Sequence, residues 1–274
     1  MQELKRHADE LDAPAIVFTF DPHPVRLLRP EQTPPPLTWT NRKADLLADL
    51  GVDAVVAYPT DEKLLSLSSR EFFDQIIIES IGAKAMVEGP NFFFGRGREG
   101  NVESLAEFCQ QADVKLSIVE PLKTDTQFIS SSRIRDLIRD GKVADAAAML
   151  TAPYRIRGMV THGAARGGKI GFPTANLDGV DTLIPANGVY AGRAHASNRW
   201  HWAAINIGPN PTFAEHESKV EVHILDFEQS IYGMTIEVDF IQRLRDIRQF
   251  DSAQQLTEQL QKDIADTRRI ARLS

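Results

Sequence analysis

Residues 168–176 read Gly168-Lys-Ile-Gly171-Phe-Pro-Thr174-Ala-Asn176 and lie in a part of the chain with strand-like runs on both sides. Thr174 and Asn176 are two positions apart, so in an extended segment their side chains leave the same face. A hydroxyl oxygen and an amide oxygen are hard, neutral donors that suit magnesium beside the phosphates of a nucleotide. Taken alone, a Thr-x-Asn pair is more often turn chemistry.

The runs around this stretch alternate or are rich in strand-forming residues, and turn signals such as Pro185-Ala-Asn-Gly188 and Tyr232-Gly233 separate them. The runs are 154–160, 188–194, 202–207, 219–225 and 235–240. Several strands without helices between them predict an antiparallel barrel or sandwich. A final helix over about 252–273 closes the chain.

The segment Gly163-Ala-Ala-Arg-Gly-Gly168-Lys169 fills the first seven positions of a P-loop, but Ile170 stands where that motif needs Ser or Thr for magnesium. It also lies between strands, without the helix that should follow, so a Walker site is not expected. A glycine-rich loop with a lysine still approaches phosphates through backbone N–H groups. We therefore expect Gly163, Lys169, Gly171 and Thr174 to bind ATP.

The first 150 residues have a different pattern, in which apolar runs alternate with amphipathic stretches. The apolar runs are 15–20, 54–58, 85–88 and 115–119, and the amphipathic stretches are 41–50, 69–81, 102–111 and 132–140. This order predicts a parallel sheet covered on both faces, as in a doubly wound α/β domain. A helix over 2–11 runs straight into the first of these strands, so the strand and phosphate-binding loop expected before it are missing. A helix that simply covers the sheet is the alternative.

Length and charge set limits on this interpretation. The chain has 274 residues, enough for about two domains, and we place them at 1–150 and 151–274. The net charge is −7, and the acidic excess lies entirely before Thr151. Binding of nucleic acid over a broad charged surface is excluded, because it needs clustered Lys and Arg. A local basic pocket for a small phosphorylated ligand is not excluded by this charge balance.

Cysteine and hydropathy point to an intracellular chain. The single Cys109 excludes a disulfide framework and a cysteine zinc site, and its helical surroundings predict a small core residue. No apolar run is long enough to span a membrane, and the start, Met1-Gln-Glu-Leu-Lys-Arg6, lacks an apolar signal region. We expect a cytoplasmic protein that binds neither membrane nor nucleic acid, whose oligomeric state the pattern leaves open.

Over about 154–273 the chain resembles riboflavin kinase. The motif Gly171-Phe-Pro-Thr-Ala-Asn176 is the hallmark of that family, and other motifs follow in the family's order: Asn187-Gly-Val-Tyr-Ala191, Asn206-Ile-Gly-Pro-Asn-Pro-Thr-Phe213, Val220-Glu-Val-His-Ile-Leu-Asp-Phe227, Ile231-Tyr-Gly233 and Leu244-Arg-Asp246. The resemblance implies an antiparallel β-barrel with a terminal helix, which phosphorylates riboflavin to FMN with ATP and Mg²⁺.

The resemblance also implies roles for single residues. Thr174 and Asn176 bind magnesium with the nucleotide, and Glu221 is the base that accepts the proton of the ribityl 5′-hydroxyl as that oxygen attacks the γ-phosphate. Without the resemblance, Glu221 would be interpreted as a residue on the solvent-exposed face of an alternating strand. Arg245 matches an arginine near the flavin, but the acidic residue that usually follows two places later is Ile247 here.

The first half resembles the FMN adenylyltransferase module of bacterial FAD synthetase, the partner of riboflavin kinase in a bifunctional enzyme. The matching motifs are Thr19-Phe-Asp-Pro-His-Pro24, Gly89-Pro-Asn-Phe-Phe-Phe-Gly95 with the residues up to Gly100, and Ile129-Ser-Ser-Ser-Arg-Ile-Arg135. The resemblance implies a Rossmann-like nucleotidyltransferase domain, here incomplete. It leaves a residual nucleotide site at Asn91, Ser131, Ser132 and Arg135. Helix capping is the alternative role for Ser130–Ser132.

One family feature is missing from the first half. Adenylyl transfer in the family depends on an early strand and a His-x-Gly-His loop, which stabilise charge on the transferring phosphate. No two of the seven histidines are three positions apart: His7, His23, His162, His195, His201, His216 and His223. Either the start was assigned too late or the loop has been lost. FAD synthesis is therefore doubtful, and a non-catalytic flavin- or nucleotide-binding protein with a degraded first domain is the alternative to an FMN-forming enzyme.

Overall fold

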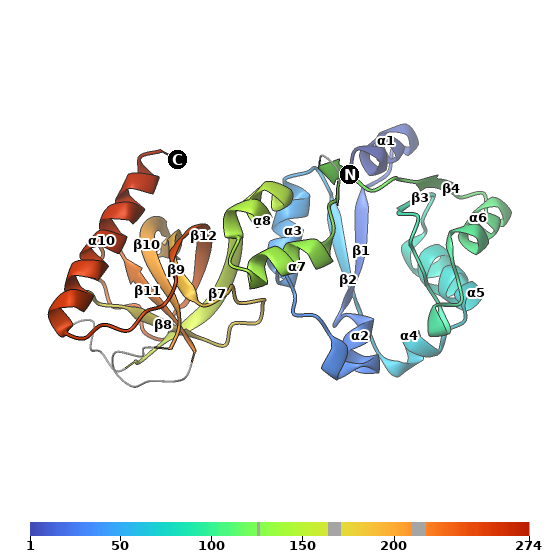
Figure 1. Ribbon diagram of the computed structural model, residues 1–274. Coiled ribbons are helices and arrows are strands. Elements are labelled where there is room, and N and C mark those ends of the chain that lie inside the picture. Colours follow the sequence, from blue (N-terminus) through green and yellow to red (C-terminus); the bar gives the residue numbers. More distant parts are fainter. Residues whose placement is uncertain (125–126, 164–170, 210–217, 274) are drawn as a thin grey trace. The chain divides into compact units, whose positions relative to one another are not determined.

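The structure, a computed structural model, describes residues 1–124, 127–163, 171–209 and 218–273. The chain forms two compact units, which we describe separately (Figure 1). The first unit holds residues 1–34 and 39–128, and the second holds residues 35–38 and those from 129 onward.

The first unit contains parallel strands, as the alternating pattern predicts. Strand β1 (Ile16–Asp21) pairs in parallel with β2 (Ala54–Pro59), and β3 (Ala85–Glu88) pairs in parallel with β4 (Lys115–Ile118). The strands β5 (Lys123–Thr124) and β6 (Gln127–Phe128) form a short antiparallel ladder. The helices between them are α1 (Gln2–Leu11), α2 (Pro24–Leu28), η1 (Pro30–Gln32), α3 (Thr40–Ala48), α4 (Glu62–Ser66), α5 (Ser69–Phe72), the π-helix η2 (Phe73–Ile81), η3 (Arg96–Arg98) and α6 (Val102–Gln111).

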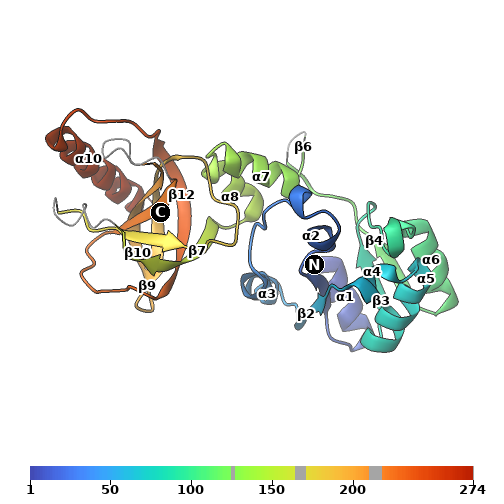
Figure 2. The same ribbon diagram turned by 90° about the horizontal axis from the view of Figure 1, so that it is seen from below.

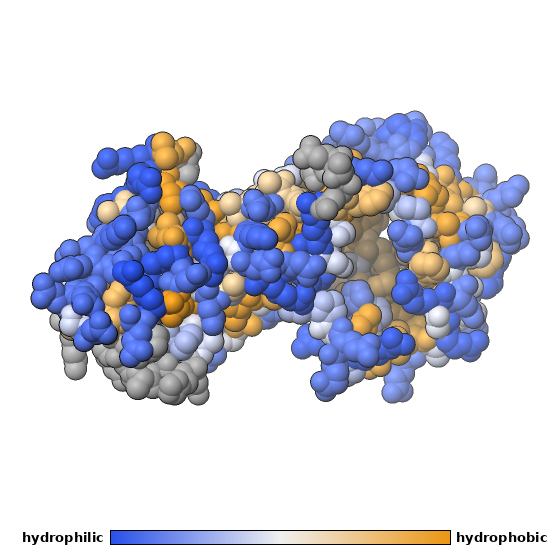
Figure 3. Space-filling model, in the orientation of Figure 1, coloured by the Kyte–Doolittle hydropathy of each residue, from blue (hydrophilic) through white to orange (hydrophobic). Residues whose placement is uncertain are grey.

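The two parallel pairs are not joined into one sheet. Within the described residues β1 pairs only with β2, and β3 only with β4, so each of these strands keeps one unpaired edge. The expected helix α1 leads directly into β1, with no strand before it among the described residues. Figure 3 shows the first unit hollowed, with apolar residues at the bottom of the hollow.

The core of the first unit lies beside these strands. Phe73, Leu105 and Cys109 are almost fully buried there. The prediction that Cys109 is a small core residue is therefore confirmed. Burial also raises the pKa of its thiol to about 11, so the thiol stays protonated at neutral pH.

The second unit is a closed antiparallel barrel of six strands, in the order β10-β11-β8-β7-β12-β9. The strands are β7 (Tyr154–Thr161), β8 (Ala175–Asp178), β9 (Gly188–Ala196), β10 (Arg199–Gly208), β11 (Lys219–Ile224) and β12 (Thr235–Arg245). The expected barrel is confirmed. Strand β8 was not among the predicted runs, because it is short and lies at the end of the glycine-rich motif of residues 168–176.

Alternation along each strand fills the barrel. Ile156, Ile205, Val222 and Val238 have no exposed surface, while most of their neighbours in sequence are partly exposed. The helix α10 (Ala253–Ala271) runs beside the barrel against β9 and β10 (Figures 1 and 2). The predicted terminal helix is thus confirmed, and the hydroxyl of Ser252 caps it by accepting from the backbone N–H of Gln255 at 3.2 Å.

A buried carboxylate connects three barrel strands. The side chain of Asp239 on β12 is fully buried, and it accepts from Arg155 on β7 at 2.5 Å and from Arg193 on β9 at 2.9 Å. Trp200 lies over the guanidinium of Arg155 at 4.3 Å. A buried charge is tolerated only when it is paired, so the two arginines and the aspartate have to be present together.

Helices α7 (Ser131–Arg139) and α8 (Val143–Leu150) pack with the barrel. Ile138, Val143 and Ala146 belong to the barrel's core cluster, and the backbone N–H of Leu183 donates to the carbonyl of Pro36 at 2.9 Å. Because these helices pack with the barrel, the main segment of the second unit starts at residue 129. The predicted domain boundary at 150/151 stays a prediction.

Candidate active site on the barrel

A row of polar side chains crosses four neighbouring strands of the barrel. Asn206 on β10 lies directly opposite Glu221 on β11, Glu221 lies opposite Asn176 on β8, and Asn176 lies opposite Thr161 on β7. Within each strand the neighbours of these residues are buried, so the four side chains face outward. We call these four residues the polar row. The barrel register brings together Asn176 and Glu221, which are 45 positions apart in the sequence.

Contacts within the row hold its members close. The Nδ2 of Asn206 donates to Oε2 of Glu221 at 3.4 Å, and the hydroxyl of Thr161 donates to the backbone carbonyl of Asn176 at 3.5 Å. Gly163 lies against the amide of Asn176, where a Cβ would come within 2.1 Å of Nδ2. A side chain at position 163 would therefore displace the amide of Asn176.

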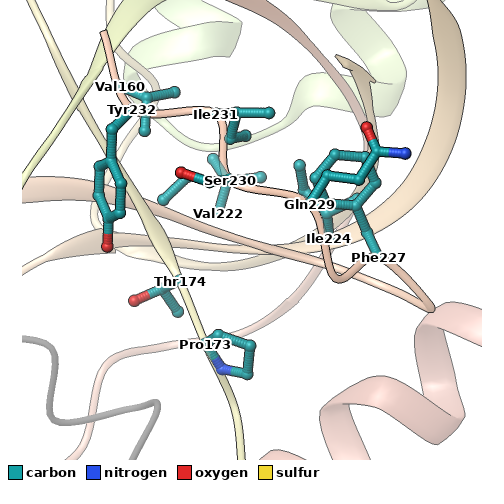
Figure 4. Close-up of a pocket in the computed structure, with 11 residues that line it drawn as sticks. Val160, Pro173, Thr174, Val222, Ile224, Phe227, Gln229, Ser230, Ile231 and Tyr232 are labelled. Atoms are coloured by element: carbon teal, nitrogen blue, oxygen red, sulfur yellow. The ribbon is translucent and has the colours of Figure 1, made fainter. Parts of the chain in front are cut away.

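A pocket opens at the end of the barrel where β7 and β11 finish and β8 begins (Figure 4). Aliphatic and aromatic side chains line most of it, with Thr174, Gln229 and Ser230 as polar groups. The lining residues are Val160, Pro173, Thr174, Ala175, Val222, Ile224, Phe227, Gln229, Ser230, Ile231 and Tyr232. An apolar pocket with a few polar groups is typical of a small-molecule site.

The segment over this pocket is fixed to β7. The ring of Tyr232 stacks on His162 with a centroid distance of 3.9 Å, and the backbone N–H of Gly233 donates to the carbonyl of Val160 at 2.8 Å. From the sequence, Ile231-Tyr-Gly233 is recognisable as a family motif that contains a turn signal. Its packing here makes it one wall of the pocket.

Thr174 and Asn176 lie on the same side of β8 and its approach, as predicted. Both are half-buried, and Ala175 between them points into the barrel. Thr174 lines the pocket and Asn176 belongs to the polar row, so the two residues connect these features. Their oxygen donors fit magnesium only beside further oxygens from a nucleotide. Among the described residues, no group of three His, Cys, Asp or Glu side chains could hold a metal ion alone.

The other expected ATP contacts are placed in part. Gly171 has a φ of +87°, a left-handed conformation that favours glycine. Gly163 lies beside the amide of Asn176. Lys169 lies outside the described residues.

Arg245 ends β12 and is held by the terminal helix. Its Nε donates to Oδ1 of Asp263 at 3.0 Å and its Nη2 donates to Oδ2 at 2.7 Å. Asp263 is almost fully buried, and Gln259 also donates to it, at 2.7 Å. The guanidinium of Arg245 thus has an acidic partner on α10, while position 247 holds Ile247. Asp263 lies four residues before the buried Thr267 and seven before the buried Ile270, and an acidic residue in such a helical stripe could have signalled this pairing.

A second pocket adjoins Arg245. The ring of Phe250 lies 5.8 Å from the guanidinium of Arg245, and the pocket is lined by Arg248, Gln249, Phe250, Gln255, Glu258, Gln259 and Lys262. It combines an aromatic ring with several hydrogen-bonding side chains. Sequence reasoning missed it, because its two walls come from a loop and a helix that only the fold brings together.

The residual nucleotide site expected in the first half falls on two compact units. Asn91 is exposed just after β3 in the first unit. Ser131, Ser132 and Arg135 belong to α7 in the second unit. Ser130 caps α7 by accepting from the backbone N–H of Arg133 at 3.3 Å, so capping engages Ser130 rather than its two neighbours. The Nε of Arg135 donates to the carbonyl of Pro35 at 2.9 Å.

Known proteins match both halves of the chain. The riboflavin kinase family profile matches residues 150–271, and the FAD synthetase profile matches residues 1–133. The bifunctional riboflavin kinase/FMN adenylyltransferase of Bacillus subtilis is 34% identical over 265 residues, which cover 94% of this chain and 83% of the relative. The enzyme of that name from Escherichia coli K12 is 30% identical over 264 residues, covering 96% and 84%.

The chain belongs to the bifunctional riboflavin kinase/FMN adenylyltransferase family. The resemblance drawn from the motifs is thereby confirmed. So is the expected order of a nucleotidyltransferase-type domain followed by the kinase barrel with its terminal helix. A solved protein of Streptococcus pneumoniae, described as a macrolide-efflux protein, is similar with a TM-score of 0.83 at 35% identity, covering 97% of this chain and 88% of that one. Within the described ranges, no helix is long and apolar enough to cross a membrane.

Glu88 at the end of β3 is a further titratable group beside a family motif, directly before Gly89-Pro-Asn91. Burial raises the pKa of its carboxyl from 4.5 to about 7. An acid whose pKa is raised on folding contributes stability below its unfolded pKa, and this contribution is lost as the pH rises through the folded pKa. The first unit should therefore lose stability between about pH 5 and about pH 8.

We expect Glu88→Gln to raise the unfolding temperature of the first unit at about pH 8 and to change it little at about pH 5, because the variant never buries a charge. Calorimetric unfolding of the full chain at several pH values measures this. Glu107→Gln on the exposed face of α6 serves as the control. An equal effect of Glu88→Gln at both pH values would contradict the assignment.

Proposed function

We propose that the barrel transfers the γ-phosphate of ATP to the 5′-hydroxyl of riboflavin, which yields FMN and ADP. The observation that carries this proposal is the placement of Glu221 directly opposite Asn176, with Thr174 two residues away at the edge of a pocket. A carboxylate beside two oxygen donors provides a base and a metal-binding edge at one place. A protein that only binds flavin or nucleotide has no need for both, so this arrangement favours the enzyme over the non-catalytic alternative.

The pocket at the barrel end suits the nucleotide. Phe227 and Tyr232 offer aromatic surface to a base, and Gln229 and Ser230 offer polar groups for its edge. A base in this pocket would direct its phosphates past Thr174 toward the polar row. Gly163, Lys169 and Gly171 are the residues we assign to the phosphates, through a glycine-rich backbone and one lysine.

Glu221 acts as the general base in this proposal. Its carboxylate accepts the proton of the riboflavin 5′-hydroxyl while the hydroxyl oxygen forms a bond to the γ-phosphorus. The bond between that phosphorus and the oxygen bridging to the β-phosphate breaks, and ADP leaves. Thr174 and Asn176 would hold Mg²⁺ together with phosphate oxygens, and the ion would offset negative charge on the phosphates.

We assign the flavin to the Arg245 side of the barrel. The guanidinium is fixed by two hydrogen bonds to the buried carboxylate of Asp263, so its position is set before any ligand binds. The adjoining pocket offers the ring of Phe250 to an aromatic ligand. The flavin and the nucleotide would then approach the polar row from different elements of the barrel.

FMN adenylylation is assigned by family to the N-terminal half of the chain, and Asn91, Ser131, Ser132 and Arg135 stay the residual nucleotide-binding residues that the family motifs imply. The sequence offers no His-x-Gly-His loop for the charge on the transferring phosphate. We therefore propose an enzyme that forms FMN and little FAD. Its partners are riboflavin, FMN and ATP with Mg²⁺, and its place is the cytoplasm, without nucleic acid or membrane.

Glu221→Gln should lower kcat for FMN formation by about 10²–10⁴-fold, because the amide keeps the shape of the side chain but accepts no proton. The KM for riboflavin should change little. Glu237→Gln is the matched control: Glu237 also alternates with buried residues on a barrel strand, but it pairs with Arg155. Steady-state kinetics with riboflavin, ATP and magnesium measure both variants. If Glu221→Gln kept the parental rate, Glu221 would not be the general base but an ordinary residue on the outer face of the strand.

The full chain should make little or no FAD from FMN, ATP and magnesium. Fixed charges and dipoles often supply most of the rate enhancement in such catalysis, and the histidine loop that supplies them in the family is absent from this sequence. Chromatography of the products tests this, with FMN formation from riboflavin in the same sample as proof of active protein. Rapid FAD synthesis would show that another group in this chain replaces the histidine loop.

A further inference from the structure

We propose that Asn206 positions the carboxylate of Glu221 for proton transfer, an inference that rests on the proposed kinase function. Asn206 lies directly opposite Glu221 in the antiparallel ladder of β10 and β11, and its Nδ2 donates to Oε2 of Glu221 at 3.4 Å. Asn206 is a positioning residue in this account, because it acts on the reacting hydroxyl only through Glu221.

The barrel fixes the place of Asn206. Ile205 and Ile207 on either side of it are buried in the core, so a change of register by one residue would expose both and turn Asn206 inward. Asn206 is also half-buried, which limits competition from water for its amide. The core of the barrel therefore sets the position from which the amide reaches the carboxylate.

Glu221 lies between two asparagines that have different surroundings. Asn176 on β8 packs against Gly163 and is two residues from Thr174 at the pocket. Asn206 lies on the other side of Glu221, away from β8, and donates to its carboxylate. An ionised carboxylate only accepts hydrogen bonds, so the amide nitrogen of an asparagine is a suitable partner for it. The two asparagines thus have separate roles, one toward the metal-bound nucleotide and one toward the base.

The expected effect follows from the mobility of a glutamate side chain. Without a partner on the β10 side, the carboxylate of Glu221 would spread over more rotamers, and a misplacement of about 1 Å costs roughly 100-fold in rate. We expect Asn206→Ala to lower kcat between about 10-fold and 100-fold. The KM values for riboflavin and MgATP should stay within about twofold, since Asn206 contacts Glu221 rather than either substrate in this account.

The decisive experiment combines Asn206→Ala with Glu221→Gln in the full chain and measures kcat, KM and the unfolding temperature of both single variants and the double variant. If Asn206 acts through the base, the double variant turns over no more slowly than Glu221→Gln alone. Ala204→Ser, two residues earlier on the same face of β10, is the matched control and should keep the parental rate. Asn206→Asp, which has the same shape but no donor, replaces the alanine variant if that variant does not fold.

Three results would overturn the proposal. They are an unchanged kcat in Asn206→Ala, a change confined to KM, and a loss in the double variant equal to the product of the two single losses, which would indicate a general structural role. A parental chain that forms no FMN would instead overturn the proposed function itself, and this inference with it.

Discussion

Strand β8 spans only Ala175–Asp178, yet it pairs with β11 on one side and with β7 on the other, and these ladders complete the barrel. Because directly opposite residues in antiparallel ladders share a face, the same pairing places Asn176 between Glu221 and Thr161. Barrel closure and site assembly therefore have one cause. This strand of four residues keeps its place because it pairs with a longer strand on each side and its inward residues, Ala175 and Leu177, are buried in the barrel.

The two units differ in how many of their strands are hydrogen-bonded to a neighbour on both sides. In the barrel every strand has two neighbours, and the one fully buried aspartate, among the described residues, is paired with two arginines. In the described part of the first unit β1 and β3 each keep an unpaired edge, and Glu88 at the end of β3 titrates near neutral pH. The unit with the complete sheet is also the one in which the proposed catalytic groups come together.

Much of the fold and part of the candidate site could be predicted from the sequence. Alternation and strand composition predicted five of the six barrel strands, all but β8, and the spacing of Thr174 and Asn176 predicted a shared face. The opposition of Glu221 and Asn176 was not predicted, since no local pattern encodes the register between distant strands; the family resemblance implied only a role for each residue. Asp263 and Asn206 were missed for the same reason: their partners, Arg245 and Glu221, lie on other elements. The packing of residues 129–150 on the barrel was missed because helix periodicity does not say which core a helix joins.

The central claim is that this protein transfers the γ-phosphate of ATP to riboflavin. Following the label from ATP marked at its γ-phosphate, with riboflavin and magnesium present, tests this most directly. The account predicts that the label appears on FMN, with one ADP formed for each FMN. Label recovered only as inorganic phosphate, or retained on ATP while riboflavin stays unmodified, would contradict it.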